Sequence, residues 1–305
     1  MMISVIIPIF NEKEVLDELF ERVSSVLSEI TGDYEIIFVD DGSWDGSLEK
    51  LIGFHNDDQR VKIISLSKNF GHPAAITAGL EHAKGEFIAM MDGDLQDPPE
   101  LIRDMYGKLS SGEIDVINGR RKSRKEKQKK RLVIYLFHRL FVKLSGLKEI
   151  ENSGNFSMLN RSALDAMLAM KEKTRYLPGL RSFIGFRHDF VDYIREDRKA
   201  GKSKMGLKKL LGLGSDAIFS FSRVPLKICL ILGLIGVAVF MLAGIYVIFA
   251  KIFGLAPLGW SSTLLSIYFL GSIQLTFMGV IGEYIFRIYK ESQDRPLYII
   301  RKIYH

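Results

Sequence analysis

Carboxylates and an amide follow a short apolar segment at residues 87–91, and their spacing suits cation chemistry. The apolar segment predicts a buried strand, and Pro98-Pro99-Glu100 predicts the first turn of a helix. Ligands of open α/β sheets bind where loops leave the carboxyl ends of the strands. Asp92, Asp94 and the amide oxygen of Gln96 offer hard ligands for Mg²⁺ or Mn²⁺, which would neutralise a diphosphate. A solvated Asp-rich turn that caps a helix is the alternative interpretation.

Acidic side chains recur at the ends of other predicted strands. Glu12 follows the first apolar segment, and Asp40 and Asp41 follow the second. A phosphate site made only of backbone amides would not need these acids, whereas a nucleoside together with a metal would use them. We therefore expect Asp41 to accept a hydrogen bond from a base N–H or a ribose hydroxyl. A turn with an N-cap is the alternative for residues 40–43, and the chain has no Gly-x-Gly-x-x-Gly dinucleotide loop.

Strand and helix patterns alternate in front of and behind these acids. β-Branched and apolar segments predict strands at residues 3–9, 34–39, 61–66, 87–91 and 115–118. Helical patterns lie between them, and the first presents apolar side chains at helical spacing, namely Leu16, Leu19, Phe20, Val23 and Leu27. This alternation predicts βαβ units and a mainly parallel sheet.

Two long apolar segments lie near the C-terminus of the 305-residue chain, in which 47% of the residues are hydrophobic. Residues 228–250 are uncharged, and within a second uncharged segment, 252–282, a further span is expected at about 262–285. At about 1.5 Å per residue, each helix would cross a hydrocarbon core of about 30 Å. Two core helices of a soluble domain are the alternative.

Basic residues predict the orientation of these spans. Basic residues flank the outer ends of both spans, whereas the connecting loop offers only Lys251. We therefore expect the protein in the plasma (inner) membrane, with both termini in the cytoplasm.

The sequence also bears on the cellular compartment. Residues 1–9 lack a signal-peptide pattern, and the single Cys229 excludes an intrachain disulfide and fits a reducing compartment. A net charge of +6 suits an anionic membrane or a nucleic acid, and the spans favour the membrane, so no nucleic-acid partner is expected.

Four motifs occur in order: Ile-Pro-Ile-Phe-Asn-Glu (7–12), Val-Asp-Asp-Gly-Ser (39–43), Lys-Asn-Phe-Gly (68–71) and Asp-Gly-Asp-Leu-Gln-Asp-Pro-Pro-Glu (92–100). They resemble the inverting GT-A glycosyltransferases of family 2, and more narrowly the polyprenyl-phosphate branch with dolichyl-phosphate mannose synthase and bacterial bactoprenyl-phosphate glucosyltransferases. The resemblance implies a cytoplasmic Rossmann-like GT-A domain at 1–205, a juxtamembrane interfacial helix at 206–226, two transmembrane helices at 227–288 and a cytoplasmic basic tail at 289–305.

The same resemblance implies roles for particular residues. Asp94 and Gln96, with Asp92, would hold the Mg²⁺ or Mn²⁺ ion, and Asp94 would be needed for catalysis. The nucleotide-sugar is expected to meet a set of residues from the four motifs, namely Pro8, Phe10, Asn11, Glu12, Asp41, Lys68, Asp92 and Gly93.

Two basic segments complete the expected site. Arg121 begins a basic segment that extends to Arg131, and its position matches an Arg of the family thought to meet the phosphates. Residues 195–205 resemble the family's Arg-x-x-Gly-x-Ser-Lys segment, which would give Arg198, Ser203 and Lys204 to the acceptor phosphate. Solvated basic loops are the alternative for both. Amphipathic helices suited to the membrane surface are expected at 132–144 and 207–221.

Asn155 departs from the family pattern. Relatives usually have Gly-Asp-Phe-Arg-Leu where this chain has Gly-Asn-Phe-Ser-Met, and the Asp has been proposed as the base. An amide cannot take a proton, but a lipid phosphate is already an anion and needs no base, unlike a hydroxyl acceptor. Asn155 therefore favours a phosphate acceptor, and its role in catalysis would be orientation.

The resemblance implies transfer of glucose from UDP-glucose to undecaprenyl phosphate with inversion, for glycan or cell-envelope modification. GDP-mannose-dependent transfer to a polyprenyl or dolichyl phosphate is the first alternative, and a non-catalytic membrane scaffold that binds nucleotide-sugars is the second. A processive polysaccharide synthase is disfavoured because neither Trp44 nor Trp260 follows an Arg as in its Gln-x-x-Arg-Trp motif. A flippase and a downstream glycosyltransferase would be further partners, and glycines in the spans permit a homo-oligomer such as a tetramer.

Overall fold

The computed structural model describes residues 1–121, 153–194, 224–253 and 259–305. The chain forms two compact units. The first unit comprises Met1–Gly214 together with Pro296–His305, and the second comprises Ser215–Arg295. The predicted helices at 132–144 and 207–221, and the expected boundaries at residues 205 and 206, lie outside the described residues.

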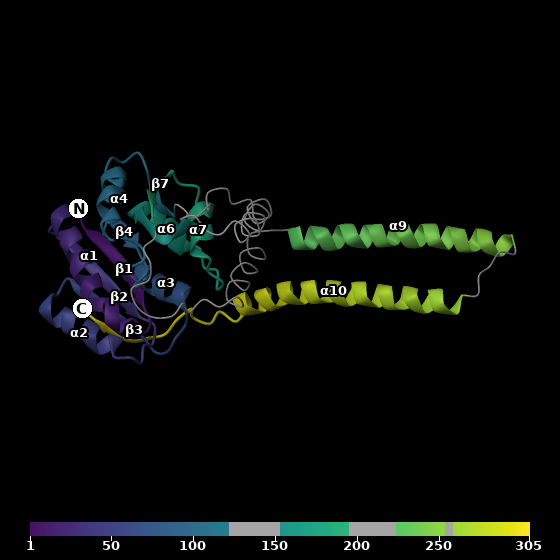
Figure 1. Ribbon diagram of the computed structural model, residues 1–305, viewed down its shortest axis with the longest axis horizontal. Helices are drawn as coiled ribbons and strands as arrows, with labels where there is room; N and C mark the ends of the chain where they lie inside the picture. Colours follow the sequence, from purple (N-terminus) through teal and green to yellow (C-terminus); the bar gives the residue numbers. More distant parts are fainter. Residues whose placement is uncertain (122–152, 195–223, 254–258) are drawn as a thin grey trace. The chain divides into compact units, whose positions relative to one another are not determined.

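An eight-stranded sheet forms the centre of the first unit, in the order β7-β5-β6-β4-β1-β2-β3-β8 (Figure 1). Its strands are β1 (Ile3–Ile9), β2 (Tyr34–Asp40), β3 (Val61–Leu66), β4 (Phe87–Met90), β5 (Val116–Arg121), β6 (Ser153–Asn160), β7 (His188–Tyr193) and β8 (Ile300–Tyr304). Only β6 and β8 run opposite to the other strands, since β6 pairs antiparallel with β4 and β5, and β8 with β3. The prediction of a mainly parallel α/β sheet is confirmed, and its five predicted strands correspond to β1–β5.

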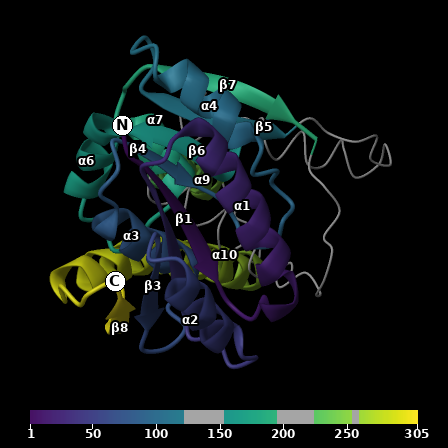
Figure 2. The ribbon, with the colours of Figure 1, turned by 90° about the vertical axis from the view of Figure 1, so that its left-hand side faces the viewer.

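Helices cover both faces of this sheet (Figure 2). They are η1 (Lys13–Val15), α1 (Leu16–Ile30), α2 (Ser47–Asp57), α3 (His72–His82), α4 (Leu101–Leu109), α6 (Arg161–Ala169) and α7 (Leu177–Phe183). Alternate β1 side chains such as Val5 and Ile7 pack in one core with α1, α2 and α4. On the other face α3 approaches so closely that a Cβ on Gly79 would lie 2.3 Å from Ile6 Cγ2. The resulting layers fix the position of each strand end.

One edge of the sheet collects the chemistry-bearing residues. Because β1–β5 and β7 run in the same direction, their carboxyl ends meet there. Strand β6 runs the other way, so its amino end reaches the same edge, with Ser157 opposite both Met90 and Asn118. The sequence analysis did not predict β6, although this strand brings Asn155 to the edge where Asp92 follows β4.

The last strand, β8, differs from the expected basic tail at 289–305. It pairs antiparallel with β3, with Ser65 opposite Lys302. The Ser67 N–H donates to Ile299 O at 2.8 Å, and Arg301 Nη2 donates to Ser67 O at 2.9 Å. The end of the chain therefore belongs to the sheet of the first unit. Five residues that pair with one partner strand at an edge give too short a pattern for sequence periodicity to detect.

The second unit contains two long helices, α9 (Val224–Ile252, 29 residues) and α10 (Trp260–Ser292, 33 residues). They lie side by side, and Gly233 of α9 leaves room for the Phe277 ring of α10 (Figure 1). Both are long and apolar enough to cross a membrane, over windows at Cys229–Tyr246 and Phe269–Ser292 whose side chains are not buried. The predicted spans at 228–250 and about 262–285 lie within these helices.

Candidate active site

The first three motifs meet at the edge beyond β1, β2 and β3, the first two through hydrogen bonds between backbone N–H groups and side chains, and the third by close packing against Gly42. Asn11 has a φ of 53°, its N–H donates to Ser43 Oγ at 3.0 Å, and its Oδ1 accepts the Trp44 N–H at 2.9 Å. Gly42 has a φ of 73°, and a Cβ there would lie 2.7 Å from the Lys68 carbonyl carbon. Segments far apart in sequence thus lie side by side and form the surface of the first three motifs, where Phe10, Asn11 and Glu12 are half-buried.

Asp41 is buried beneath this surface and organises a loop. One carboxylate oxygen accepts the Phe70 N–H at 2.7 Å, and the other accepts the Gly71 N–H at 3.0 Å. Burial raises the pKa of Asp41, and these two bonds offset part of the rise. The predicted hydrogen bond from a nucleoside to this carboxylate stays a prediction, and in the structure each of its oxygens accepts one N–H of the loop at 68–71. Lys68 is exposed on that loop, with Nζ 5.2 Å from the centre of the Phe70 ring.

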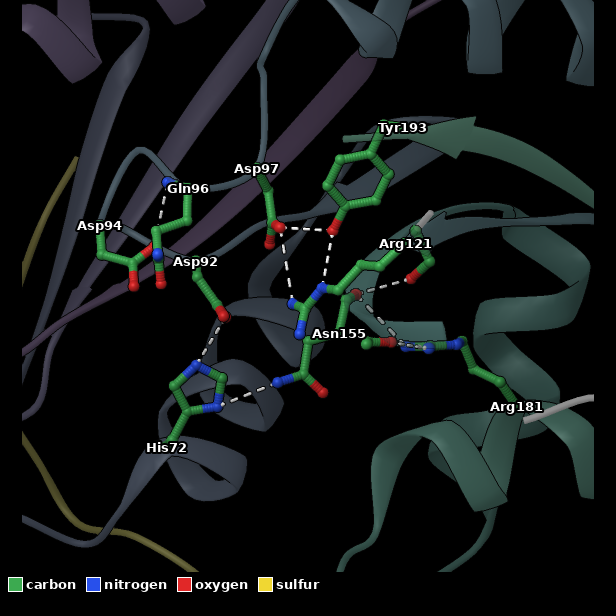
Figure 3. A network of polar contacts seen from close by, with 11 residues as sticks. His72, Asp92, Asp94, Gln96, Asp97, Arg121, Asn155, Arg181 and Tyr193 are labelled. Atoms are coloured by element: carbon green, nitrogen blue, oxygen red, sulfur yellow. Dashed lines mark hydrogen bonds and ion pairs between the residues drawn. The ribbon is translucent and has the colours of Figure 1, made fainter. Parts of the chain in front are cut away.

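The acidic turn after β4 is compact. Gly93 fits where a Cβ would lie 2.5 Å from Ile9 Cδ1 and 3.1 Å from Pro8 O, and Pro8 itself is buried within β1. Leu95 follows with a φ of 56°. Asp94 is only 8% exposed, and its Oδ1 accepts the Gln96 N–H at 3.2 Å. The turn therefore brings the Gln96 backbone N–H to Asp94, with Asp92 nearby (Figure 3), and joint binding of a metal ion by these residues stays a prediction.

These residues suit a divalent ion that also binds a diphosphate. Within the described part of the chain, no three His, Cys, Asp or Glu side chains gather as a metal site of protein ligands alone. Magnesium typically takes one or two carboxylates and completes its octahedron with substrate phosphates and water. The two carboxylates and one amide oxygen of the turn match this requirement.

His72 links the acidic turn to Asn155, and the sequence analysis did not single it out. It is the first residue of α3, with Nε2 2.9 Å from Asp92 Oδ1 and Nδ1 3.5 Å from Asn155 Nδ2 (Figure 3). Desolvation lowers the pKa of His72, but the bond to Asp92 and its charge outweigh this, so the pKa is raised. The imidazole thus joins the start of α3 to the turn after β4 and to the amino end of β6.

Two arginines lie on the other side of Asn155. Arg181 of α7 is 1% exposed, and it donates to Asn118 Oδ1 at 3.1 Å and to Gly154 O at 2.5 Å, so it fixes the start of β6. Burial lowers the pKa of Arg181 to about 10. Arg121, at the end of β5, donates through Nε to Tyr193 Oη at 3.0 Å. Cations and acids therefore face the same small region around Asn155 (Figure 3).

The predicted site residues divide into three groups. The acidic turn, Asn155 and Arg121 lie together at one edge, and the nucleotide-binding candidates of the first three motifs lie along the adjoining strand ends. Arg198, Ser203 and Lys204 lie outside the described residues. Four residues that sequence reasoning missed join the site: His72, Asp97, Arg181 and Tyr193. His72 directly follows the third motif and Asp97 lies within the fourth, but nothing in the sequence signals the contacts of Arg181 and Tyr193.

Known proteins share this sequence and fold. Residues 4–168 match the family described as glycosyl transferase family 2. An uncharacterised glycosyltransferase of Bacillus subtilis (strain 168) is 41% identical over 305 residues, or 99% of this chain and 94% of its own length. The prophage bactoprenol glucosyl transferase homologue of Escherichia coli (strain K12) is 36% identical over 305 residues, or 99% of both chains. The prophage-derived bactoprenol glucosyl transferase of Shigella flexneri is 36% identical over 304 residues, or 99% of this chain and 98% of its own.

Solved structures share the arrangement of the sheet and helices. Glucosyl-3-phosphoglycerate synthase from Mycobacterium tuberculosis in complex with uridine diphosphate superposes with a TM-score of 0.51 at 19% identity, covering 71% of this chain and 77% of that one. Its complex with Mn²⁺, uridine-diphosphate-glucose and phosphoglyceric acid gives a TM-score of 0.50 at 17% identity and the same coverage. The predicted GT-A fold is confirmed. With its family match over residues 4–168 and relatives that align along almost its whole length, the chain belongs to the family 2 glycosyltransferases.

Proposed function

We propose that the protein transfers glucose from UDP-glucose to the phosphate of a polyprenyl phosphate, with inversion at the anomeric carbon. The observation that carries this proposal is the meeting of acids and cations around the neutral Asn155 at one edge of the sheet. A nucleotide-sugar with a metal suits the acids, and a second phosphate suits Arg121, whose side chain is 30% exposed. Relatives named bactoprenol glucosyl transferases, 36% identical over almost the full chain, support the glucose donor and the polyprenyl acceptor.

The donor lies along the ends of β1, β2 and β4 in this proposal. The nucleoside occupies the surface built by the first three motifs, with contacts from Pro8, Phe10, Asn11, Glu12 and Lys68, while Asp41 acts through the loop that it orders. The diphosphate lies at the turn of Asp92, Gly93, Asp94 and Gln96. A Mg²⁺ or Mn²⁺ ion held by Asp94, Gln96 and Asp92 neutralises diphosphate charge when bound.

The acceptor phosphate lies on the Asn155 side. One of its oxygens attacks the anomeric carbon as the bond from that carbon to the UDP oxygen breaks on the opposite face, so an α-linked donor gives a β-linked lipid product. The attacking oxygen already carries negative charge, so no proton has to be removed and an amide at position 155 suffices. Arg121 binds this phosphate, which reduces its repulsion from the donor diphosphate. Arg198, Ser203 and Lys204 are proposed to act at the same phosphate.

The proposed lipid acceptor and the two apolar helices of the second unit both support a location at a membrane. Because residues before Ser215 and after Arg295 share one sheet, the chain between them must cross a bilayer an even number of times. Two apolar helices satisfy this condition. The basic residues beside the outer ends then favour a catalytic unit and both termini in the cytoplasm, beside the plasma (inner) membrane.

A transfer assay tests the proposed function. Full-length protein receives UDP-glucose labelled in the sugar, undecaprenyl phosphate and Mn²⁺ or Mg²⁺, and label is counted in the chloroform phase. We expect chloroform-soluble label that depends on the lipid and the metal, and a β-linkage by NMR. Label from GDP-mannose instead would replace the proposed donor. No lipid product from any nucleotide-sugar would contradict an enzymatic function and favour a nucleotide-sugar-binding scaffold.

A further inference from the structure

A buried carboxylate connects the acidic turn to Arg121. Asp97 immediately follows Gln96, and its side chain is 0% exposed. The Tyr193 hydroxyl donates a short hydrogen bond to Asp97 Oδ1, and Arg121 Nη2 lies 3.5 Å from the same oxygen. Arg121 Nε donates to the Tyr193 oxygen at 3.0 Å, which closes a triangle of three side chains (Figure 3).

Two members of this triangle are held in place, Tyr193 by packing and Asp97 by the burial of its charge. The Tyr193 ring meets the Phe156 ring edge to face, with 5.7 Å between their centres. A Cβ on Gly119 would lie 3.0 Å from Tyr193 Cε1, so the ring has little room to move. A carboxylate as buried as Asp97 requires a cation and hydrogen-bond donors, because burial of an unpaired charge is very costly. Arg121 and Tyr193 supply a cation and a hydrogen-bond donor to Asp97 Oδ1, and this attraction holds the guanidinium beside that oxygen.

Arg121 nevertheless keeps surface for a ligand. Its side chain is 30% exposed, and the two contacts described use Nε and Nη2, which leaves the Nη1 edge outside them. Gly154 gives the guanidinium space, since a Cβ there would lie 2.7 Å from Arg121 Nη2. Arg181 is the contrast, because it is 1% exposed and bonds to protein carbonyls and an amide. The Arg121 geometry suits an arginine that is fixed on one side and presented to an anion on the other.

We propose that Asp97 and Tyr193 are positioning residues that hold Arg121 toward the acceptor phosphate. Through Asp97, which lies in the same turn as Asp94 and Gln96, they set the distance between the acceptor phosphate and the donor diphosphate. This inference rests on the proposed function, because it assigns residues to the acceptor side of that reaction. If Asp97 and Tyr193 only stabilised the fold, their loss would not affect one substrate in particular. A positioning role predicts instead that the kinetics for the acceptor change while those for the donor do not.

The adjacent ion pair provides a matched control. Arg120 precedes Arg121 on β5, and its Nε donates to Asp192 Oδ1 at 2.5 Å. Successive strand side chains point to opposite faces, so this pair has the same chemistry one residue away from the site. Asp192→Asn therefore removes a carboxylate that binds an arginine between the same two strands, β5 and β7, and leaves Asp97, Tyr193 and Arg121 unchanged.

Steady-state transfer with each substrate varied in turn tests the inference. We expect Asp97→Asn to lower kcat/KM for the polyprenyl phosphate by about 10- to 100-fold, because a displacement of about 1 Å costs this much. Tyr193→Phe, which removes one hydroxyl, should lower it by about 3- to 10-fold. The KM for the nucleotide-sugar should stay within about twofold in both variants, and Asp192→Asn should leave both kcat/KM values unchanged.

A double-mutant cycle separates positioning from general damage. In an Arg121→Gln background, adding Asp97→Asn or Tyr193→Phe should cause no further loss, because both residues act through Arg121. The inference would be overturned if Asp97→Asn and Tyr193→Phe lowered the acceptor kcat/KM by the same factor with and without Arg121. It would also be overturned if the KM for the nucleotide-sugar rose by as large a factor as the acceptor kcat/KM fell. Melting curves identify a variant that does not fold, and Tyr193→Phe then decides, since it leaves the ion pair in place. Absence of lipid product from the wild type contradicts the proposed function itself, which is a different outcome.

Discussion

The two halves of the site are held in different ways. In the donor half, at the ends of β1–β4, acidic and amide side chains accept hydrogen bonds from backbone N–H groups, as Asp41 does from Phe70 and Gly71. In the acceptor half, at the ends of β5–β7, the cation Arg121 is held by side chains, one of them 72 residues away. Backbone contacts fix a loop shape and so require whole motifs, whereas side-chain contacts can be made by residues from any part of the chain.

The largest expected effect comes from the donor half. Asp94→Ala removes a proposed metal ligand, and loss even of an outer-shell partner costs about 10- to 100-fold in metal affinity or activity. We expect transfer to fall by more than about 100-fold while the melting temperature without ligand is retained. Transfer by this variant within about twofold of wild type would remove the acidic turn from the mechanism.

The second largest effect is expected from a change in the backbone of the donor half, at Gly42. In Gly42→Ala, the new Cβ would meet Lys68 and Asn69 backbone atoms at 2.7 and 2.8 Å, at a φ of 73°. We expect a loss of about 1–3 kcal/mol in the free energy of unfolding, measured with urea, together with weaker UDP binding. Gly32→Ala is the control, because a Cβ at Gly32 meets nothing within 4 Å. Normal UDP affinity in Gly42→Ala would show that the loop at 68–71 does not shape the donor site.

The acceptor half should respond differently to the same kind of change. In Gly154→Ala the three atoms nearest the new Cβ all belong to the Arg121 guanidinium, which is the far end of a flexible side chain and can move away. We expect unchanged stability and an acceptor kcat/KM lowered by about tenfold. Gly107→Ala, on α4 with open space around it, should match the wild type. A loss of stability without an acceptor defect would mean that Gly154 serves the fold alone.

The smallest effect is expected at the opposite edge of the sheet, away from both halves. Asp115, which precedes β5, accepts from Arg187 and Asn160, and the hydrogen bond from Arg187 is the main cause that lowers its pKa to about 2. Because the pKa of Asp115 is lower in the folded state than in the unfolded state, its ionised carboxylate stabilises the fold above about pH 4. This contribution to stability is lost as the pH falls toward 2. Asp115→Asn should cost about 1 kcal/mol at pH 7, given the exposure of Arg187, and flatten the acid limb of the stability curve. Transfer activity should not change.

The same contrast explains how much of the fold and the site could be predicted. Strands β1–β5 and the acidic turn that follows β4 are encoded by contiguous patterns, and the structure contains them. Strand β8 and Tyr193 depend on contacts between residues that are far apart in sequence, and no local pattern marks them. His72 lies between these cases, because its position follows a motif but its bond to Asp92 requires the start of α3 to lie beside the end of β4.

Metal-dependent binding of the donor tests the division of the site most directly. With UDP-glucose at about 100 times its Kd and Mn²⁺ present, the wild type should gain about 2.7 kcal/mol of apparent stability, measured by thermal unfolding. The account predicts that Asp94→Ala loses this gain and that Arg121→Gln keeps it. Equal stabilisation of Asp94→Ala and the wild type, or a loss in Arg121→Gln as large as in Asp94→Ala, would contradict separate donor and acceptor halves.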